Sequence, residues 1–311
     1  MGKILTFGEP LMTFHIPLLN TVVASGGSNT NMSLGGSEIN TAIALHRLGH
    51  EVTLLTVLPN NELGQYYKDV LKEIGISTKY VLLSNGSMGN MFIKDNQVCY
   101  DRKHSAFYNM NSMLFPLDDI FKESFDWIHL TGITPSLSNH NLNVWKSILE
   151  QGLKQNIRVS FDFNHRPSLI DFTDLWKIVK PYLPFLTIIF LSEADIKHIL
   201  SIEKIQSTHS MIQSLNIKQI ICCVKKQIDQ HQLRCSVLMN STSSIKSTAK
   251  KQVVIEPIGG GDAYDAAYIH SVLTMKLSIE QTLNYCDNIT IQTQKYPGHF
   301  SPIQHSTKDT S

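Results

Sequence analysis

Short apolar runs alternate with segments of helical periodicity along most of this 311-residue chain. The apolar runs predict strands at Lys3–Gly8, Val52–Leu58, Trp127–Thr131, Arg158–Phe163, Leu186–Leu191 and Gln219–Val224. Between them, helical spacing predicts helices at Glu38–Leu48, Glu62–Ile74, Leu142–Lys154, Thr173–Val179 and Glu193–Leu200. This order is typical of a parallel sheet covered by helices on both faces. The predicted fold class is therefore α/β, with a doubly wound and mostly parallel sheet flanked by helices.

Two stretches break this alternation. Residues 15–34 are rich in Ser, Asn, Thr and Gly, and residues 88–102 carry extended segments around a polar turn, which is a hairpin signal. Both could pair into a small sheet that projects from the core, or both could be ordinary surface loops, and periodicity alone leaves the two open. No internal repeat or linker divides the chain, so we expect one domain over residues 1–300 and a flexible tail over 301–311.

Composition narrows the class of partner. The chain has 27 Lys plus Arg against 26 Asp plus Glu, so it lacks the basic excess that nucleic-acid binding requires. No apolar run is long enough to span a bilayer, and the first residues do not resemble a secretory leader. The five cysteines form no C-x-x-C pair, which fits reduced thiols. We expect a cytoplasmic protein that binds neither nucleic acid nor membrane.

The most informative motif is the glycine run Gly259, Gly260 and Gly261, which is followed by Asp262 and an apolar helical pattern. Glycines let backbone N–H groups approach a ligand, and a helix N-terminus attracts anions. Phosphoryl transfer needs such donors together with a carboxylate near the attacking hydroxyl. The motif therefore indicates an anion hole with Asp262 as general base. The alternative is a structural turn in which Asp262 is only the helix N-cap.

Two familiar nucleotide motifs do not fit. A Walker A loop needs Gly-Lys-Ser/Thr, which occurs nowhere in the chain. A Rossmann fingerprint needs a third glycine after the first strand, whereas this run lies near the C-terminus and lacks it.

Other polar residues are candidates for ligand binding. Gly35 and Gly36 precede a predicted helix and allow close approach of a hydroxylated ligand, and Asn40 lies one turn further on. Asp162, Asn164 and Arg166 stand at alternate positions at and beyond the end of a predicted strand, so we expect them to point the same way, toward the edge where α/β sheets bind ligands. Arg166 could hold a carboxylate or form a structural salt bridge. Tyr100 and Arg102 alternate similarly in the predicted hairpin.

In this order, the motifs resemble those of the PfkB (ribokinase-like) carbohydrate kinases over nearly the whole chain. The resemblance rests on Gly35-Gly-x-x-x-Asn40 with Ala44-Leu-x-Arg-Leu-Gly49, on Pro59-Asn-Asn-Glu-Leu-Gly64 and on Gly259-Gly-Gly-Asp-Ala-Tyr264. Tyr100-Asp-Arg102, Leu130-Thr-Gly-Ile133, Ser160–Pro167 and Pro297-Gly298 are further similar to the branch of 2-keto-3-deoxygluconate (KDG) kinases.

The resemblance implies a ribokinase-like core with a small β lid, for which we expect segments of about residues 12–34 and 86–112. It implies ATP and Mg²⁺ as cofactors and a small sugar or sugar acid, most of all KDG, whose terminal hydroxyl Asp262 would deprotonate while Gly259–Gly261 stabilise the phosphoryl group. Ser192 and Lys225 would contact the nucleotide, and the metal ligands stay unassigned. The sugar acid would be held by Gly35, Gly36, Asn40, Tyr100, Arg102 and Arg166, with the arginines on its carboxylate.

Several positions depart from the family pattern on the nucleotide side. Ser192-Glu-Ala-Asp195 replaces Asn-x-x-Glu, Val224–Asp229 lacks the glycine of a Lys-x-Gly turn, and Asn288–Ile291 replaces an alanine-rich stretch. Tyr264-Asp265 and Ala267 replace Phe-Ala and Gly, and His299 stands where relatives have Asp.

Two rival functions therefore stay open beside a KDG kinase. One is a sugar-acid-binding protein on a kinase scaffold with little phosphotransfer, and the other is an active kinase for a different sugar, which would not need Arg102 and Arg166. An exposed edge of the lid sheet would be covered by pairing with a second copy, so we also expect a homodimer through the lid.

Overall fold

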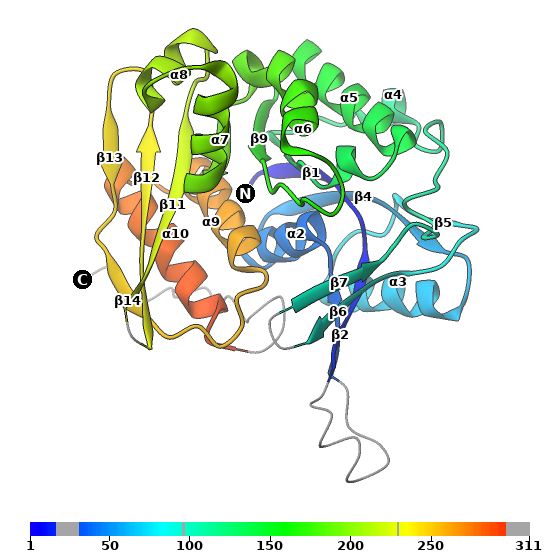
Figure 1. Ribbon diagram of the computed structural model, residues 1–311. Helices are drawn as coiled ribbons and strands as arrows, with labels where there is room; N and C mark the ends of the chain where they lie inside the picture. The colour runs from blue at the N-terminus through cyan, green and yellow to red at the C-terminus, as the bar shows by residue number, and fades with distance from the viewer. Residues whose placement is uncertain (17–30, 95–96, 229, 297–311) are drawn as a thin grey trace.

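The computed structural model describes residues 1–16, 31–94, 97–228 and 230–296, and these form a large sheet covered by helices with a smaller sheet at one end (Figure 1). The large sheet runs in the order β13-β12-β11-β10-β9-β8-β1-β4-β5, with β14 also paired to β12. Its strands are β1 Lys3–Phe7, β4 Glu51–Pro59, β5 Val81–Ser84, β8 Trp127–Thr131, β9 Arg158–Asp162, β10 Ile188–Ser192, β11 Ile220–Ile228, β12 His231–Met239, β13 Ser244–Lys246 and β14 Lys250–Gln252. Pairing is parallel from β5 to β11 and antiparallel beyond β11. The predicted mostly parallel sheet is confirmed.

Helices pack on both faces of this sheet (Figure 1). One face carries α2 Ser37–Arg47, α3 Glu62–Ile74, α9 Gly260–Thr274 and α10 Ile279–Thr293. The other carries α4 Leu117–Ile120, α5 Asn139–Lys154, α6 Phe172–Val179, α7 Glu193–Glu203 and α8 Thr208–Ser214, with the short 3₁₀ turns η1 Thr134–Ser136 and η2 Lys180–Phe185. Each face has its own buried apolar cluster, because parallel strands are apolar on both sides and need cover on both. All helices predicted from periodicity are present.

The smaller sheet has the order β3-β2-β6-β7, from strands β2 Leu11–His15, β3 Asn31–Gly35, β6 Gly89–Lys94 and β7 Gln97–Asp101. The predicted hairpin is confirmed as the antiparallel pair of β6 and β7. β2 joins the hairpin in parallel, with the Phe14 and Phe92 rings stacked at 5.4 Å. The irregular stretches thus form a projecting sheet rather than ordinary loops, as the family resemblance implied. Residues 17–30 and 95–96 lie outside the described residues, and the dimer through this lid stays a prediction.

The absence of a glycine from Val224–Asp229, one of the departures on the nucleotide side, has a structural consequence. β11 runs straight to Ile228 instead of ending at the predicted Val224, and pairs in register with β12, so that Lys225 lies opposite Arg234. Without a glycine there is no position that favours a positive φ for an early turn. The predicted strand therefore continues to Ile228 and forms a hairpin with β12, which was not predicted.

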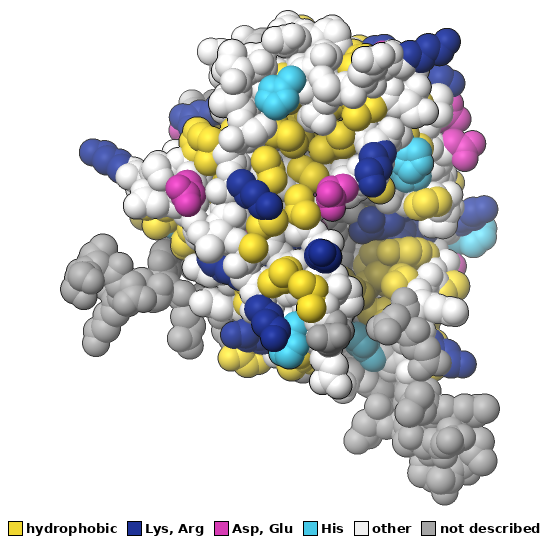
Figure 2. All heavy atoms as spheres, turned by 60° about the vertical axis from the view of Figure 1, so that its left-hand side comes forward, with side chains coloured by type: hydrophobic (Ala, Val, Ile, Leu, Met, Phe, Trp, Pro, Cys, Tyr) yellow, Lys and Arg dark blue, Asp and Glu magenta, His cyan; other side chains and the backbone are white. Residues whose placement is uncertain are grey.

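Several other expectations can be compared with the described residues. None of their helices is long and apolar enough to cross a membrane, and all five cysteines are free thiols. On the face shown in Figure 2, Lys and Arg side chains are scattered among neutral and hydrophobic ones. Pro297, Gly298, His299 and the tail 301–311 lie outside the described residues. Cytoplasmic location and the absence of nucleic-acid binding stay predictions.

Candidate active site

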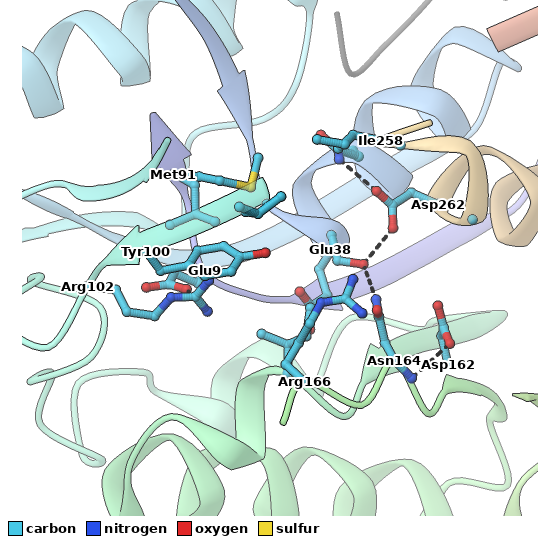
Figure 3. A pocket seen from close by; sticks show the side chains of 18 of the residues that line it. Glu9, Glu38, Met91, Tyr100, Arg102, Asp162, Asn164, Arg166, Ile258 and Asp262 are labelled. Carbon is cyan, nitrogen blue, oxygen red and sulfur yellow. Dashed lines mark hydrogen bonds and ion pairs between the residues drawn. The ribbon is translucent and has the colours of Figure 1, made fainter. Parts of the chain in front are cut away.

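A cavity of about 400 Å³ lies where the carboxyl ends of the parallel strands meet the lid and the start of α9 (Figure 3). Loops that follow β1, β8 and β9 reach it because all three strands end at the same edge of the sheet. The lid contributes Tyr100 and Arg102, and the starts of α2 and α9 close the opposite side. Of the candidate residues, the cavity is lined by Gly36, Asn40, Tyr100, Arg102, Asp162, Asn164, Arg166, Gly259, Gly261 and Asp262.

A second cavity of about 480 Å³ adjoins the first along the ends of β9, β10 and β11. It contains both candidate nucleotide residues, Ser192 and Lys225, together with Arg234. The two cavities share Asp162, Asn164, Arg166 and Gly261. A ligand in one cavity would therefore meet a ligand in the other beside the start of α9.

The glycine run places backbone donors at this junction. Gly259 is the N-cap of α9 with φ of 77°, a left-handed conformation that favours glycine, and α9 begins at Gly260. No side chain caps the first turn, so its N–H groups point outward without an N-cap acceptor. A Cβ on Gly261 would meet nothing within 4 Å. Packing does not require glycine there, and the open space fits the approach of phosphate oxygens.

Asp262 is not the N-cap of α9, so the alternative in which it only caps the helix is excluded. It lies in the first turn of α9 with 8% of its surface exposed. Its carboxylate accepts two short hydrogen bonds from α2, one from Ser37 Oγ at 2.6 Å and one from Asn40 Nδ2 at 2.6 Å. Burial raises the pKa of Asp262, while these donors and the charge of Arg166 act in the opposite direction. The carboxylate is thus a desolvated base held by neutral donors.

Glycine at position 36 is required by the backbone. Gly36 has φ of 116°, and a Cβ there would lie 2.1 Å from the carbonyl oxygen of Glu9. Gly36 is also the N-cap of α2, so this close contact positions the helix that carries Asn40. Gly35 and Gly260 line neither cavity: the Gly35 carbonyl accepts from Tyr67 Oη at 2.8 Å, and Gly260 faces Gln294.

The two arginines differ in a way that the sequence did not predict. Arg102 is buried, stacks on the Tyr100 ring at 3.8 Å, and forms an ion pair with Glu9 at 3.0 Å. Arg166 is half-buried, and no carboxylate of the described residues lies within ion-pair distance of its guanidinium. In Figure 3, Arg102 lies beside Tyr100 and Glu9, whereas Arg166 stands between this group and Asn164.

Sequence reasoning missed Glu9, although it follows directly after β1 at the edge where ligands bind. Its carboxyl is 2% exposed and lines the cavity. Burial raises its pKa to about 7 in spite of the nearby Arg102. The signal that could have identified it is a carboxylate at a strand end, the same signal that identified Asp162.

Asp162, Asn164 and Arg166 all line the cavity, as alternate positions predicted, although the backbone is not extended throughout. Asn164 has φ of 39°, and its N–H donates to Asp162 Oδ1 at 3.0 Å. Asn tolerates this left-handed conformation better than most residues. The local turn keeps the Asn164 and Arg166 side chains directed into the cavity.

The nucleotide-side departures form contacts within the fold. The Ser192 hydroxyl and Asp195 carboxylate cap α7 reciprocally, so these two side chains satisfy each other. On α10, Asn288 Oδ1 accepts from Lys250 Nζ at 2.6 Å, and Thr290 Oγ1 donates to the carbonyl of Gly260 at 3.3 Å. Among the described residues, no group of three or more His, Cys, Asp or Glu could hold a metal ion.

Buried carboxyl groups near the site predict how stability depends on pH. Burial raises the pKa of Glu38 to about 7, against hydrogen bonds from Thr134 and Thr131, and burial likewise raises those of Glu9 and Asp162 to about 7. A carboxyl group whose pKa is higher in the folded than in the unfolded state stabilises the fold while it is protonated. This contribution to the free energy of unfolding is fully present below pH 4.5 and is lost as pH rises through 7. The unfolding free energy of wild type should fall between pH 5 and pH 8. We expect this fall to be smaller in Glu38→Gln by up to about 3 kcal/mol.

Urea denaturation at pH 5 and pH 8 measures this difference, and exposed Glu150→Gln serves as the matched control. Equal pH dependence in wild type and Glu38→Gln would contradict the assignment.

Comparisons with known proteins agree with this architecture. A 2-dehydro-3-deoxygluconokinase of Bacillus subtilis is 30% identical over 175 residues, which cover 53% of this chain and 52% of that protein, so the match spans about half of its length. The structure of a 2-dehydro-3-deoxygluconokinase from Thermotoga maritima covers 97% of this chain and 95% of its own at 21% identity, with a TM-score of 0.87. An Escherichia coli structure in complex with ATP and Mg²⁺ covers 96% and 94% at 17% identity, with a TM-score of 0.80.

At these identities the two structures establish the ribokinase-like fold alone. The family comparison adds to them, because residues 1–289 match the family described as pfkB family carbohydrate kinase. That match covers the lid, both cavities and the start of α9, and so the chain belongs to the pfkB family of carbohydrate kinases.

Proposed function

We propose that the protein transfers the γ-phosphoryl group of ATP to the terminal hydroxyl of a sugar acid, and that this acid is KDG. The observation that carries the proposal is the position of Asp262 and the α9 N-terminus at the junction of two cavities. The lid-side cavity has two arginines for an acid, and the other has Lys225 and backbone donors for phosphates. The Bacillus subtilis relative is named for this substrate.

The chain's own residues would act as follows. Asp262 takes the proton of the sugar hydroxyl while the oxygen of that hydroxyl bonds to the γ-phosphorus. The bond from the γ-phosphorus to the bridging oxygen of ADP breaks. The N–H groups of Gly259 to Gly261 and the α9 dipole stabilise charge on the transferring group. Lys225 and Ser192 would contact the nucleotide, and Gly36, Asn40, Tyr100, Arg102 and Arg166 would position the sugar acid. Mg²⁺, when bound with ATP, neutralises phosphate charge.

One observation favours a second candidate, a sugar-acid-binding protein with little phosphotransfer. Ser192 and Asp195 already satisfy each other on the nucleotide side, while Arg166 in the lid-side cavity has no carboxylate of the described residues within ion-pair distance. Such a protein would bind the acid through the same arginine without turning it over.

Calorimetric titration with ATP and Mg²⁺, in the presence and absence of KDG, separates the two functions when ADP release is followed in the same samples. We expect saturable ATP binding and ADP release that depends on KDG. Binding of KDG without detectable nucleotide binding would favour the sugar-acid-binding protein, and ADP release only with another sugar would exclude KDG as the substrate.

A further inference from the structure

A chain of hydrogen bonds leads from the end of β9 to the Asp262 carboxylate. Asp162 Oδ1 accepts from the Asn164 N–H at 3.0 Å, and Asn164 Nδ2 donates to Ser37 Oγ at 2.9 Å. Ser37 Oγ in turn donates to Asp262 Oδ1 at 2.6 Å. Figure 3 shows these contacts in sequence between β9 and α9. Three separate elements, the β9 loop, α2 and α9, are thereby joined at one hydroxyl group.

The direction of the Ser37 hydroxyl follows from its two neighbours. The amide nitrogen of Asn164 can only donate, so it occupies a lone pair of Ser37 Oγ and leaves the serine proton free to point away. Asp262 is the acceptor on that other side. The turn closed by Asp162 holds Asn164 in its left-handed conformation, which fixes the position from which the Asn164 amide donates to Ser37 Oγ.

Within the part of the chain that the structure describes, the Ser37 hydroxyl forms hydrogen bonds only with Asp262 and Asn164. It is the first residue of α2, yet the helix has no side-chain cap and its N-cap is Gly36. A second contact joins α2 to α9 independently of the Ser37 hydroxyl, since Thr41 Oγ1 lies 3.2 Å from the Ser37 carbonyl oxygen and 3.4 Å from that of Asp262. The Ser37 side chain is thus dedicated to the carboxylate.

We propose that Ser37 is a positioning residue for the base Asp262, and that Asn164 orients its hydroxyl. Ser37 holds Oδ1 and Asn40 holds Oδ2, which fixes the plane of the carboxylate and leaves one lone pair of each oxygen for the sugar hydroxyl. The inference rests on the proposed role of Asp262 in phosphoryl transfer.

The hydroxyl also favours the ionised form of the base. Burial raises the pKa of Asp262, and the hydrogen bond from Ser37 is the largest interaction that opposes this, ahead of Asn40 and Arg166. The charged or titratable groups that face Asp262 are Glu38 from α2, Asp162 and Arg166 from the end of β9 and its loop, and Asp265 from α9. The three acidic groups, when ionised, disfavour an anion at Asp262. Loss of the serine donor should therefore raise the pKa of Asp262.

The first test reads the base directly and needs no turnover. The ¹³C resonance of the Asp262 carboxyl, assigned by its loss in Asp262→Asn, is followed against pH in the full-length protein. We expect the midpoint to move up by about one pH unit in Ser37→Ala, as loss of one charge-assisted hydrogen bond implies. Ser37→Thr keeps a hydroxyl and should restore the wild-type midpoint. Asn164→Ala should move the midpoint in the same direction by less.

The second test uses catalysis. With the substrate that wild type turns over, the acid limb of the kcat profile should move up in Ser37→Ala, so that kcat falls about tenfold at acidic pH and less at alkaline pH. Exposed Ser241→Ala is the matched control. A midpoint and an acid limb that are unchanged in both Ser37→Ala and Asn164→Ala would overturn the proposal. A wild type without turnover would instead count against the proposed function, while the carboxyl midpoint would still decide the role of Ser37.

Discussion

Asp262→Asn is expected to lower kcat for sugar phosphorylation by about 10²- to 10⁴-fold, because it removes the carboxylate that we propose takes the hydroxyl proton beside the phosphate donors. Asparagine keeps the size of the side chain, and its amide oxygen can accept from one of the two α2 donors that now hold the carboxylate. KM for the sugar should change much less than kcat, since the arginines and Asn40 stay in place. Steady-state ADP release at saturating ATP and varied sugar concentration measures both constants.

Two controls make this expectation sharp. Asp174→Asn changes an exposed aspartate of α6, far from the cavities, and should leave kcat unchanged. The melting temperature of Asp262→Asn should stay near or above that of wild type, because a buried carboxylate is replaced by a neutral group of the same shape. A folded Asp262→Asn with wild-type kcat would show that the hydroxyl loses its proton elsewhere.

The fold could be predicted because its signals are local. Apolar runs such as Trp127–Thr131 and amphipathic segments such as Glu62–Ile74 carry their structure in their own spacing, and each appears at nearly its predicted bounds. The late part of the sheet was harder. β13 and β14 have three residues each, too few for periodicity to identify, and the length of β11 depends on its partner β12. Pairing between distant segments decided those elements.

The site divides in a similar way. Gly259–Gly261 with Asp262, and Gly36 with Asn40, could be identified because each motif places backbone and side chain within one turn. The partners of these residues could not. The Ser37 contact to Asp262 joins residues 225 positions apart, and the Glu9 contact to Arg102 joins the first strand to the lid. Such contacts depend on how α2 packs on α9 and on how the lid closes over β1.

The Glu9 contact changes what is expected of the two arginines. The sequence treated Arg102 and Arg166 as equivalent ligands for the acid. In the folded chain, Glu9 already lies 3.0 Å from Arg102, whereas Arg166 has no carboxylate within ion-pair distance among the described residues. An incoming carboxylate would have to compete with Glu9 for Arg102 but not for Arg166. Arg166 should therefore contribute more of the affinity for a sugar acid.

Arg166→Met should accordingly raise the dissociation constant for KDG, measured by calorimetry without nucleotide, by about 30- to 10³-fold. Methionine keeps much of the apolar length of the side chain but removes the charge and the paired donors that match a carboxylate. Arg102→Met should weaken binding less, and it should cost more stability, because it leaves Glu9 buried without its partner cation.

A neutral analogue in which the carboxylate of KDG is reduced to an alcohol separates charge recognition from general damage to the cavity. If Arg166 recognises the carboxylate, the analogue binds wild type weakly and binds Arg166→Met with the same affinity. Wild type and Arg166→Met then differ in affinity only for the acid. Equal affinity of wild type and Arg166→Met for KDG would show that the cavity does not use Arg166 for an acid, which is the result expected of a kinase for an uncharged sugar. Because Arg166 lines both cavities, the same titration repeated with a non-hydrolysable ATP analogue present also tests whether the acid and the nucleotide compete for its charge. Tighter KDG binding by wild type in the absence of the analogue than in its presence would mean that they do.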